Sequence, residues 1–222
     1  MKLVLVLFTL LLGSFSLSSH ADGFFVGAEA SPYVAWKDCY FYALCTKDAS
    51  TDGNSKGGGV RIGYWLSPAG NSRDGVEIVY DKFSSVSGSE EWFPNGCSVF
   101  CNPPSAIANW KNDGELIYVD WFGYMLNRNR SWVNGLLAKA GIFASSVKTE
   151  GDYGQGGGTY ERKVSGVGVV FGMGYLIPLS EHISARAALD MFFNVKVADP
   201  LSTADTLSDT LLNLSLGLDY YF

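Results

Sequence analysis

The stretch that decides the fold is Leu212-Asn213-Leu214-Ser215-Leu216-Gly217-Leu218-Asp219-Tyr220-Tyr221-Phe222. Every even-numbered residue in it is apolar or aromatic, whereas the odd-numbered positions carry Asn, Ser, Gly, Asp and Tyr. Successive side chains of a β-strand point to opposite faces of its sheet. This period of two therefore predicts a strand with one apolar face and one polar face.

Seven further segments alternate in the same way and bring the predicted number of strands to about eight. They are residues 23–36, 60–66, 76–81, 117–125, 136–144, 166–177 and 183–196. The connections after the second, fourth and sixth segments are short, at residues 67–74, 127–131 and 178–181. The other connections are longer, notably residues 37–55 and 85–113. Short turns at one rim and long loops at the other are typical of a closed, antiparallel, up-and-down transmembrane β-barrel.

The composition agrees with an all-β membrane protein. Charged residues make up 17% of the chain, below the roughly 25% of ordinary soluble domains. After residue 17 no apolar run approaches the roughly 20 residues that a membrane-spanning helix needs, so a chain in a bilayer must pair its backbone groups in a closed sheet. The net charge of −6 offers no basic surface for nucleic acid.

The first residues have the features of an export signal. Lys2 precedes an apolar run over residues 3–12, and Ser19-His20-Ala21 places small residues at the −3 and −1 positions of a cleavage site. We expect residues 1–21 to be a cleaved secretory signal peptide and residues 22–222 to form one barrel domain.

The polar faces of the strands carry Gly, Ser, Asn, Tyr and single charges rather than the dense Lys and Glu of a water-exposed surface. We therefore predict that they face a confined interior. The alternative is a soluble, lipocalin-like barrel with an apolar lumen. Unpaired charges in a narrow interior would cost several kcal/mol, so cross-strand ion pairs are expected. The candidate interior charges are Glu29, Arg61, Glu77, Asp81, Asp120, Lys139, Arg186, Asp190, Lys196 and Asp219.

Eight alternating strands with short and long connections in turn resemble the OmpA/OmpX-type small outer-membrane barrels. The resemblance covers nearly all of residues 22–222. It implies a monomeric protein in the outer membrane of a Gram-negative bacterium, in contact with outer-membrane lipid. It also implies that Leu218, Tyr220 and Phe222 form the signal read by the outer-membrane assembly machinery. Members of this family include anchors, adhesins and lipid-modifying enzymes, so the resemblance indicates architecture rather than activity.

The two longest connections hold all four cysteines. Cys39 and Cys45 lie in the first, and Cys97 and Cys101 lie in the second. An even number of cysteines in an exported chain favours disulfides, and local pairing and cross-loop pairing both stay open. Zinc binding is the other alternative, but no His lies nearby. Loop aromatics are candidates for a recognition surface or for packing within the loop, and they include Trp92, Phe93, Phe100 and Trp110.

The sequence holds no complete catalytic set, cofactor motif or metal motif. A lipid A deacylase barrel would use a pair such as His182 and Ser184 with a carboxylate about a dozen residues later, but Lys196 stands there. The leading hypothesis is a non-enzymatic surface protein whose extracellular loops serve binding, adhesion or envelope integrity. The alternatives are an outer-membrane lipid-modifying enzyme and a narrow channel lined by the glycines of residues 166–174.

Overall fold

The computed structural model describes residues 23–37, 50–52, 55–66, 72–92, 106–125, 135–152, 158–198 and 206–222. Within these residues no helix is long and apolar enough to cross a membrane. The strands are β1 (Phe24–Lys37), β2 (Ser50–Asp52), β3 (Ser55–Trp65), β4 (Ser72–Trp92), β5 (Ala106–Met125), β6 (Leu136–Asp152), β7 (Thr159–Pro178), β8 (Ile183–Ala198) and β9 (Thr206–Tyr221). The predicted signal peptide lies outside the described residues.

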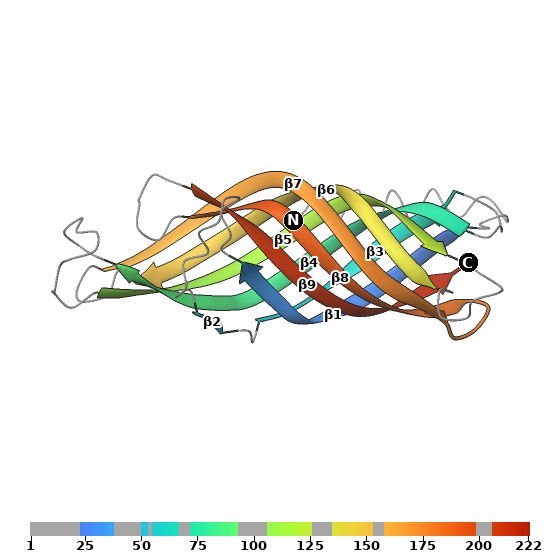
Figure 1. Cartoon of the computed structure of the whole chain (residues 1–222), viewed down its shortest axis with the longest axis horizontal. Coiled ribbons are helices and arrows are strands. Elements are labelled where there is room, and N and C mark those ends of the chain that lie inside the picture. The colour runs from blue at the N-terminus through green and yellow to red at the C-terminus, as the bar shows by residue number, and fades with distance from the viewer. Residues whose placement is uncertain are drawn as a thin grey trace.

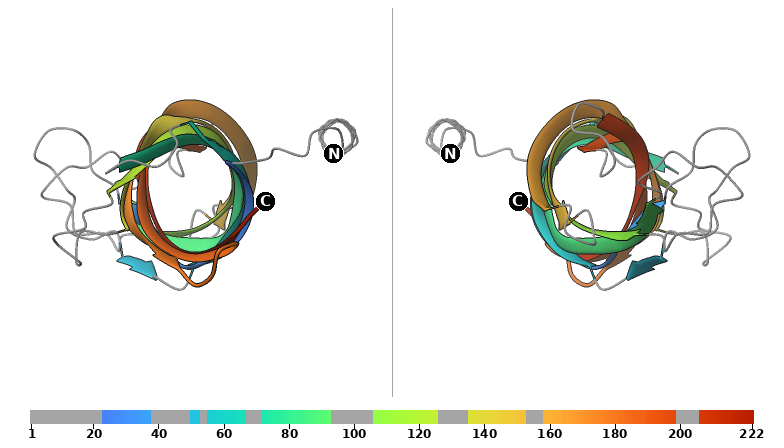
Figure 2. Two further views of the ribbon diagram at one scale, coloured as in Figure 1. Left: turned by 90° about the vertical axis from the view of Figure 1, so that its right-hand side faces the viewer. Right: turned by 90° about the vertical axis from the view of Figure 1, so that its left-hand side faces the viewer.

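Eight of these strands close into a ring. Each strand from β3 to β8 pairs antiparallel with the next, and β1 pairs with both β3 and β9 and so closes the ring. The two end views show this ring closed on itself (Figure 2). Among the described residues, the short strand β2 pairs with β4 alone and lies outside the ring. The predicted eight-stranded antiparallel barrel is confirmed.

The alternation of side chains separates an apolar exterior from a mixed interior. Outward residues of the wall are large and exposed, for example Val167 at 70% and Ile142 at 68%. The residues that alternate with them are buried inside. An apolar belt around a closed sheet is the surface that a bilayer covers, and a soluble barrel would expose this belt to water.

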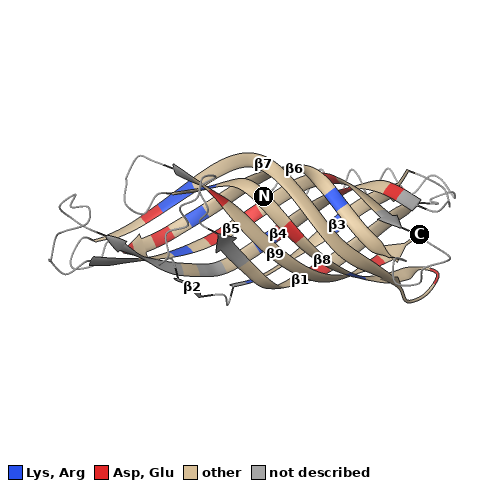
Figure 3. Ribbon diagram, in the orientation of Figure 1, with Lys and Arg blue, Asp and Glu red and all other residues tan. Residues whose placement is uncertain are grey.

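The barrel has two different ends (Figure 1). At the turn end, residues 179–182 join β7 to β8, and the C-terminus lies there. At the extended end, β4, β5, β6 and β7 run on well past the apolar belt. The charged positions of the strands are concentrated toward this end and along the middle of the barrel (Figure 3).

The prediction of one long loop over residues 85–113 is wrong. Strand β4 continues to Trp92 and β5 begins at Ala106, so most of this segment is a hairpin. Likewise, the predicted loop over residues 37–55 contains β2. Beyond the apolar belt a strand has no lipid on one side, so its side chains need not alternate between apolar and polar, although its backbone pairing continues.

The interior is layered along the barrel axis. A cluster of buried aromatic and aliphatic residues fills the turn end: Phe25, Trp65, Phe122, Leu137 and Leu176, with Tyr221 packed against them. We call it the turn-end core. A larger cluster fills the half toward the extended end and includes Val79, Phe83, Leu116, Phe143, Val170 and Phe192. We call it the extended-end core. Buried charged residues lie between the two.

Candidate functional site: a buried charge layer

Arg186 on β8 makes three hydrogen bonds to carboxylates of the buried charge layer. Its Nη1 donates to both carboxylate oxygens of Glu77 on β4, at 2.8 and 2.7 Å, across the barrel. Its Nε donates to Asp219 on β9 at 3.0 Å. The side chains of all three residues have at most 1% of their surface exposed. Planar guanidinium groups suit such multiple carboxylate contacts.

Arg61 on β3 extends the layer to the first strand. Its Nη1 pairs with Glu29 Oε2, and its Nε donates to Asp219 Oδ1 at 2.6 Å. The two oxygens of Asp219 therefore accept from two different arginines. A single carboxylate on the last strand thus joins the charges of β3 and β8.

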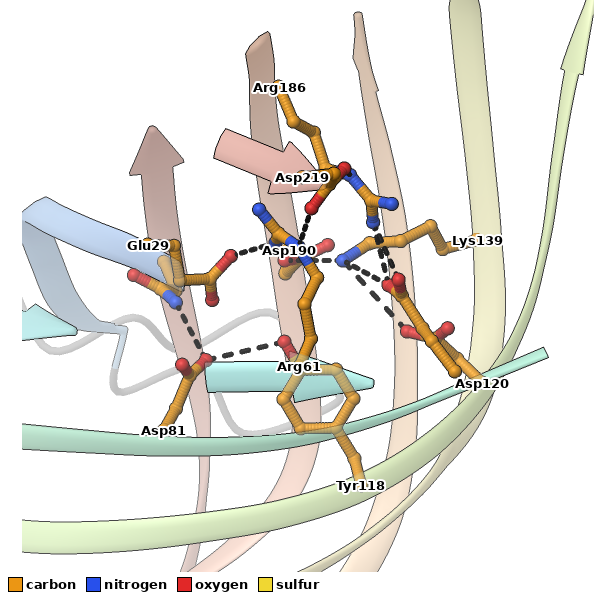
Figure 4. Close-up of polar contacts among 11 residues, drawn as sticks. Glu29, Arg61, Asp81, Tyr118, Asp120, Lys139, Arg186, Asp190 and Asp219 are labelled. Atoms are coloured by element: carbon orange, nitrogen blue, oxygen red, sulfur yellow. Dashed lines mark hydrogen bonds and ion pairs between the residues drawn. The ribbon is translucent and has the colours of Figure 1, made fainter. Parts of the chain in front are cut away.

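Lys139 on β6 is the third cation. Its Nζ lies 2.9 Å from Asp190 Oδ2, 3.8 Å from Glu77 Oε1 and 3.9 Å from Asp120 Oδ2 (Figure 4). Three cations from three strands therefore hold carboxyl groups from β1, β4, β5, β8 and β9 in one connected network. Among the described residues, no cluster of three or more His, Cys, Asp or Glu side chains is placed to hold a metal ion.

Two neutral residues that the sequence reasoning did not single out complete the layer. Tyr118 donates its hydroxyl to Asp81 Oδ2 at 3.3 Å, and Asn213 donates its side-chain amide to the same oxygen at 3.4 Å. Both residues share the inward parity of charged residues on their strands. Their inward positions in the period-of-two pattern could be predicted from the sequence. Such a position does not distinguish a residue that hydrogen-bonds to the charges from one that only packs in the interior.

Lys196, one of the ten candidate interior charges, does not join this layer. A β-bulge interrupts β8 at Asn194, which has a positive φ of 70°. A bulge adds one residue to a strand, so the alternation of faces shifts beyond it. Val195 and Val197 consequently face the interior, whereas Lys196 is half-buried and its Nζ donates to Ser208. The other nine candidates are buried in the interior.

The apolar cores on either side close the charge layer off. The guanidinium of Arg186 lies 5.7 Å from the ring centre of Phe25 and 5.5 Å from that of Phe122, so the turn-end core packs directly against it. On the other side the Lys139 ammonium lies 5.7 Å from the ring centre of Tyr118, within the extended-end core. The described interior is therefore filled with side chains on both sides of the charges.

The inward glycines of β7 do not leave a passage. A Cβ placed at Gly172 would overlap the carboxylate of Asp190, and one at Gly168 would lie 2.6 Å from the ring of Phe143. These glycines thus accommodate side chains from neighbouring strands. This filling argues against the predicted alternative of a glycine-lined channel.

Most of the loop candidates lie outside the described residues. They are Cys39, Cys45, Cys97, Cys101, Phe93 and Phe100. Trp92 is the last residue of β4. Trp110 was predicted to lie in a loop, but it lies in β5 and packs, partly buried, against the extended-end core. Trp110 is therefore a packing residue of the barrel.

The residues of the predicted assembly signal lie on the outer wall at the turn end. Leu218, Tyr220 and Phe222 all point outward and are exposed. The rings of Tyr220 and Phe222 meet edge to face at 5.2 Å. His182 stacks on Tyr220, and its Nδ1 lies 3.1 Å from the backbone oxygen of Tyr221. His182 thus sits on the outer wall, whereas Ser184 is buried inside, which does not favour a His–Ser catalytic pair.

The extended end carries charges on its outer face. Lys148 Nζ on β6 lies 2.5 Å from Glu150 and 3.0 Å from Glu161 on β7. The hydrogen bond to Glu150, which has the larger effect, and the hydrogen bond to Glu161 raise the pKa of Lys148 above its ordinary value. These groups are well exposed, so such pairs add little to stability. They mark this face as one bathed in water.

No family model matches the chain, and no curated protein matches it. Solved structures match over most of their length. Ail, the attachment invasion locus protein of Yersinia pestis, is 13% identical with a TM-score of 0.48, and the match covers 90% of this chain and 99% of that one. The N-terminal β-barrel domain of Pseudomonas aeruginosa OprF is 13% identical with a TM-score of 0.43, covering 89% and 97%. The outer membrane protease OmpT from Escherichia coli is 12% identical with a TM-score of 0.44, covering 94% and 100%. At these identities the similarity concerns the barrel fold alone.

Proposed function

We propose that this chain is a monomeric, non-enzymatic surface protein of a Gram-negative outer membrane. In this proposal the barrel anchors in lipid and presents its extended end, together with the cysteine-containing loops, to the outside for binding or adhesion. The observation that carries it is the length of β4 to β7 beyond the apolar belt. On β6, for example, the outward residues change from Ile142 to Lys148 and Glu150. About seven residues of strand, roughly 20 Å, follow the belt.

A sheet that stands clear of the bilayer is a rigid support for loops. The hairpin of β4 and β5 keeps its pairing as far as Trp92 and Ala106, and the hairpin of β6 and β7 keeps its pairing as far as Asp152 and Thr159. Binding residues are often found on loops that a rigid scaffold positions. The filled interior supports this proposal over a channel, and the outward position of His182 supports it over a lipid hydrolase.

Cysteine labelling on intact cells tests the orientation and the loop disulfides together. We expect a membrane-impermeant maleimide to label the protein only after reduction, because Cys39, Cys45, Cys97 and Cys101 would be paired and outside. Labelling without reduction would show free thiols. If reduced intact cells were not labelled but lysed cells were, the loops would lie on the periplasmic side of the outer membrane.

Adherence of cells to an epithelial monolayer tests the binding role. Cells that display the protein should adhere several-fold more than cells with an empty vector. The double variant Phe93→Ala/Phe100→Ala should lose this gain, whereas the matched surface variant Lys148→Ala should keep it. The amount of folded barrel, measured as the band whose gel mobility changes on boiling, should be equal in the wild type and in both variants. Adherence equal to that of the empty vector would contradict the proposal. A change in the lipid A mass spectrum on expression would instead favour the enzyme.

A further inference from the structure

Two carboxyl groups of the charge layer meet over a glycine. In the ring, Glu29 on β1 is opposite Gly59 on β3, and Gly59 is opposite Asp81 on β4. Because Gly59 has no side chain, Asp81 Oδ1 occupies the space that a Cβ would take. The carboxyl groups of Glu29 and Asp81 therefore approach from the two strands on either side of Gly59, and they face one another in the close-up (Figure 4).

In each of these two carboxyl groups one oxygen accepts hydrogen bonds from other side chains, and the second oxygen has no hydrogen-bond donor among the described residues. Glu29 Oε2 accepts from Arg61, and Asp81 Oδ2 accepts from Tyr118 and Asn213. Glu29 Oε1 and Asp81 Oδ1 are buried, and no described residue donates a hydrogen bond to either. Two ionised carboxylates cannot satisfy each other, since neither has a hydrogen to donate. One proton between these two oxygens would satisfy both.

The balance of charge points the same way. The layer contains three cations and six carboxyl groups, namely Arg61, Lys139 and Arg186 against Glu29, Glu77, Asp81, Asp120, Asp190 and Asp219. No ion pair within 4 Å joins Asp81 to a described cation, whereas each of the other five carboxyl groups has at least one. An isolated ionised carboxylate in such an interior is strongly disfavoured, and two that share a site cannot readily both ionise.

We propose that Glu29 and Asp81 form a proton-binding site inside the barrel, in which one proton is shared between Glu29 Oε1 and Asp81 Oδ1 at neutral pH. The pair behaves as one titrating unit. The charged or titratable groups around it come from four strands: Arg61 from β3, Tyr118 from β5, Lys139 from β6, and Arg186 and Asp190 from β8. Asp219 and Asp120 are linked to it through Arg61 and Lys139. The site does not depend on the proposed surface function.

The pH dependence of unfolding tests this site. In the unfolded chain both carboxyl groups are ionised above about pH 6, so folding takes up the shared proton. The folding equilibrium constant then falls about tenfold for each rise of one pH unit on account of this proton. In Asp81→Asn the amide donates to Glu29 in its place, and no proton is taken up. We expect the slope of log K against pH between about 6 and 8 to differ by one between the wild type and Asp81→Asn.

The measurement is urea unfolding of the full chain refolded in phospholipid vesicles, followed by tryptophan fluorescence. Glu29→Gln should change the slope as Asp81→Asn does. The matched control is Asp219→Asn, which removes the carboxylate shared by two arginines and should destabilise the barrel while keeping the wild-type slope. Infrared spectra should show a protonated-carboxyl band that both pair variants lose.

Two outcomes would overturn the proposal. A wild-type slope in folded Asp81→Asn and Glu29→Gln would show that both groups are ionised in the native barrel. A wild-type folding equilibrium constant that rises with sodium or calcium concentration, with no such rise in Asp81→Asn, would show that a metal cation occupies the site in place of a proton.

Discussion

Replacing Arg186 with methionine tests whether the charge layer holds the barrel together. The change removes one buried cation that bonds Glu77 and Asp219. Breaking a buried ion pair on one side costs about 3–5 kcal/mol. Here Glu77 keeps Lys139 at 3.8 Å and Asp219 keeps Arg61 at 2.6 Å, so the lower half of that range applies, roughly 3–4 kcal/mol.

With a urea dependence of about 2 kcal/mol per molar, this loss lowers the unfolding midpoint by roughly 1.5–2 M. The assay is urea unfolding in vesicles, with the unboiled gel mobility as a second probe of the closed barrel. Adding Glu77→Gln to Arg186→Met should restore at least half of the lost free energy of unfolding, because the Glu77 carboxylate that Arg186 had neutralised is then removed as well. An Arg186→Met midpoint equal to that of the wild type would refute the reasoning and would show that water solvates these charges.

Three further predictions follow from the wall and the interior. Gly172→Leu puts carbon atoms where two charged side chains lie, so the heat-modifiable form should be lost, whereas Ala138→Leu on the outer wall should retain it. Leu216→Arg, at an outward position that is 52% exposed, should cost about 2–4 kcal/mol in vesicles. Ser165→Arg, beyond the belt, should cost little, and equal effects of these two arginines would contradict the membrane orientation. The wild type should be silent in planar bilayers at all voltages, because apolar cores cover the charge layer on both sides, and steady unitary currents would contradict this filling.

The sequence predicts the membrane-facing part of this fold well, because lipid on one side imposes a strict alternation. The inward positions of residues such as Arg61 and Glu77 could be read from their parity on each strand. The extended ends of β4 and β5 could not, since both of their faces lack lipid and no period of two marks them. Lys196 was misplaced for a related reason. The bulge at Asn194 is a local backbone event. Asparagine adopts positive φ more readily than most residues, but its presence in a strand does not by itself predict a bulge.

Which interior charges pair is a property of the closed ring. Glu77 and Arg186 are 109 residues apart in the chain, and Arg61 and Asp219 are 158 apart. Their contacts depend on the stagger of the strands and on which positions lack a side chain. Gly59 illustrates this, because its importance comes from the residues on both sides of it in the ring and not from its neighbours in the sequence.

The position of Asp219 on the last strand has a consequence for how the barrel assembles. Until β9 docks between β8 and β1, neither Arg61 nor Arg186 has this carboxylate, and two arginines face an incomplete interior. Joining such distant segments is slow, and the contact is made only at closure. Seven assembled strands would therefore lack the one carboxylate that joins the two arginines, and docking of the final strand would supply it in the same step that closes the ring.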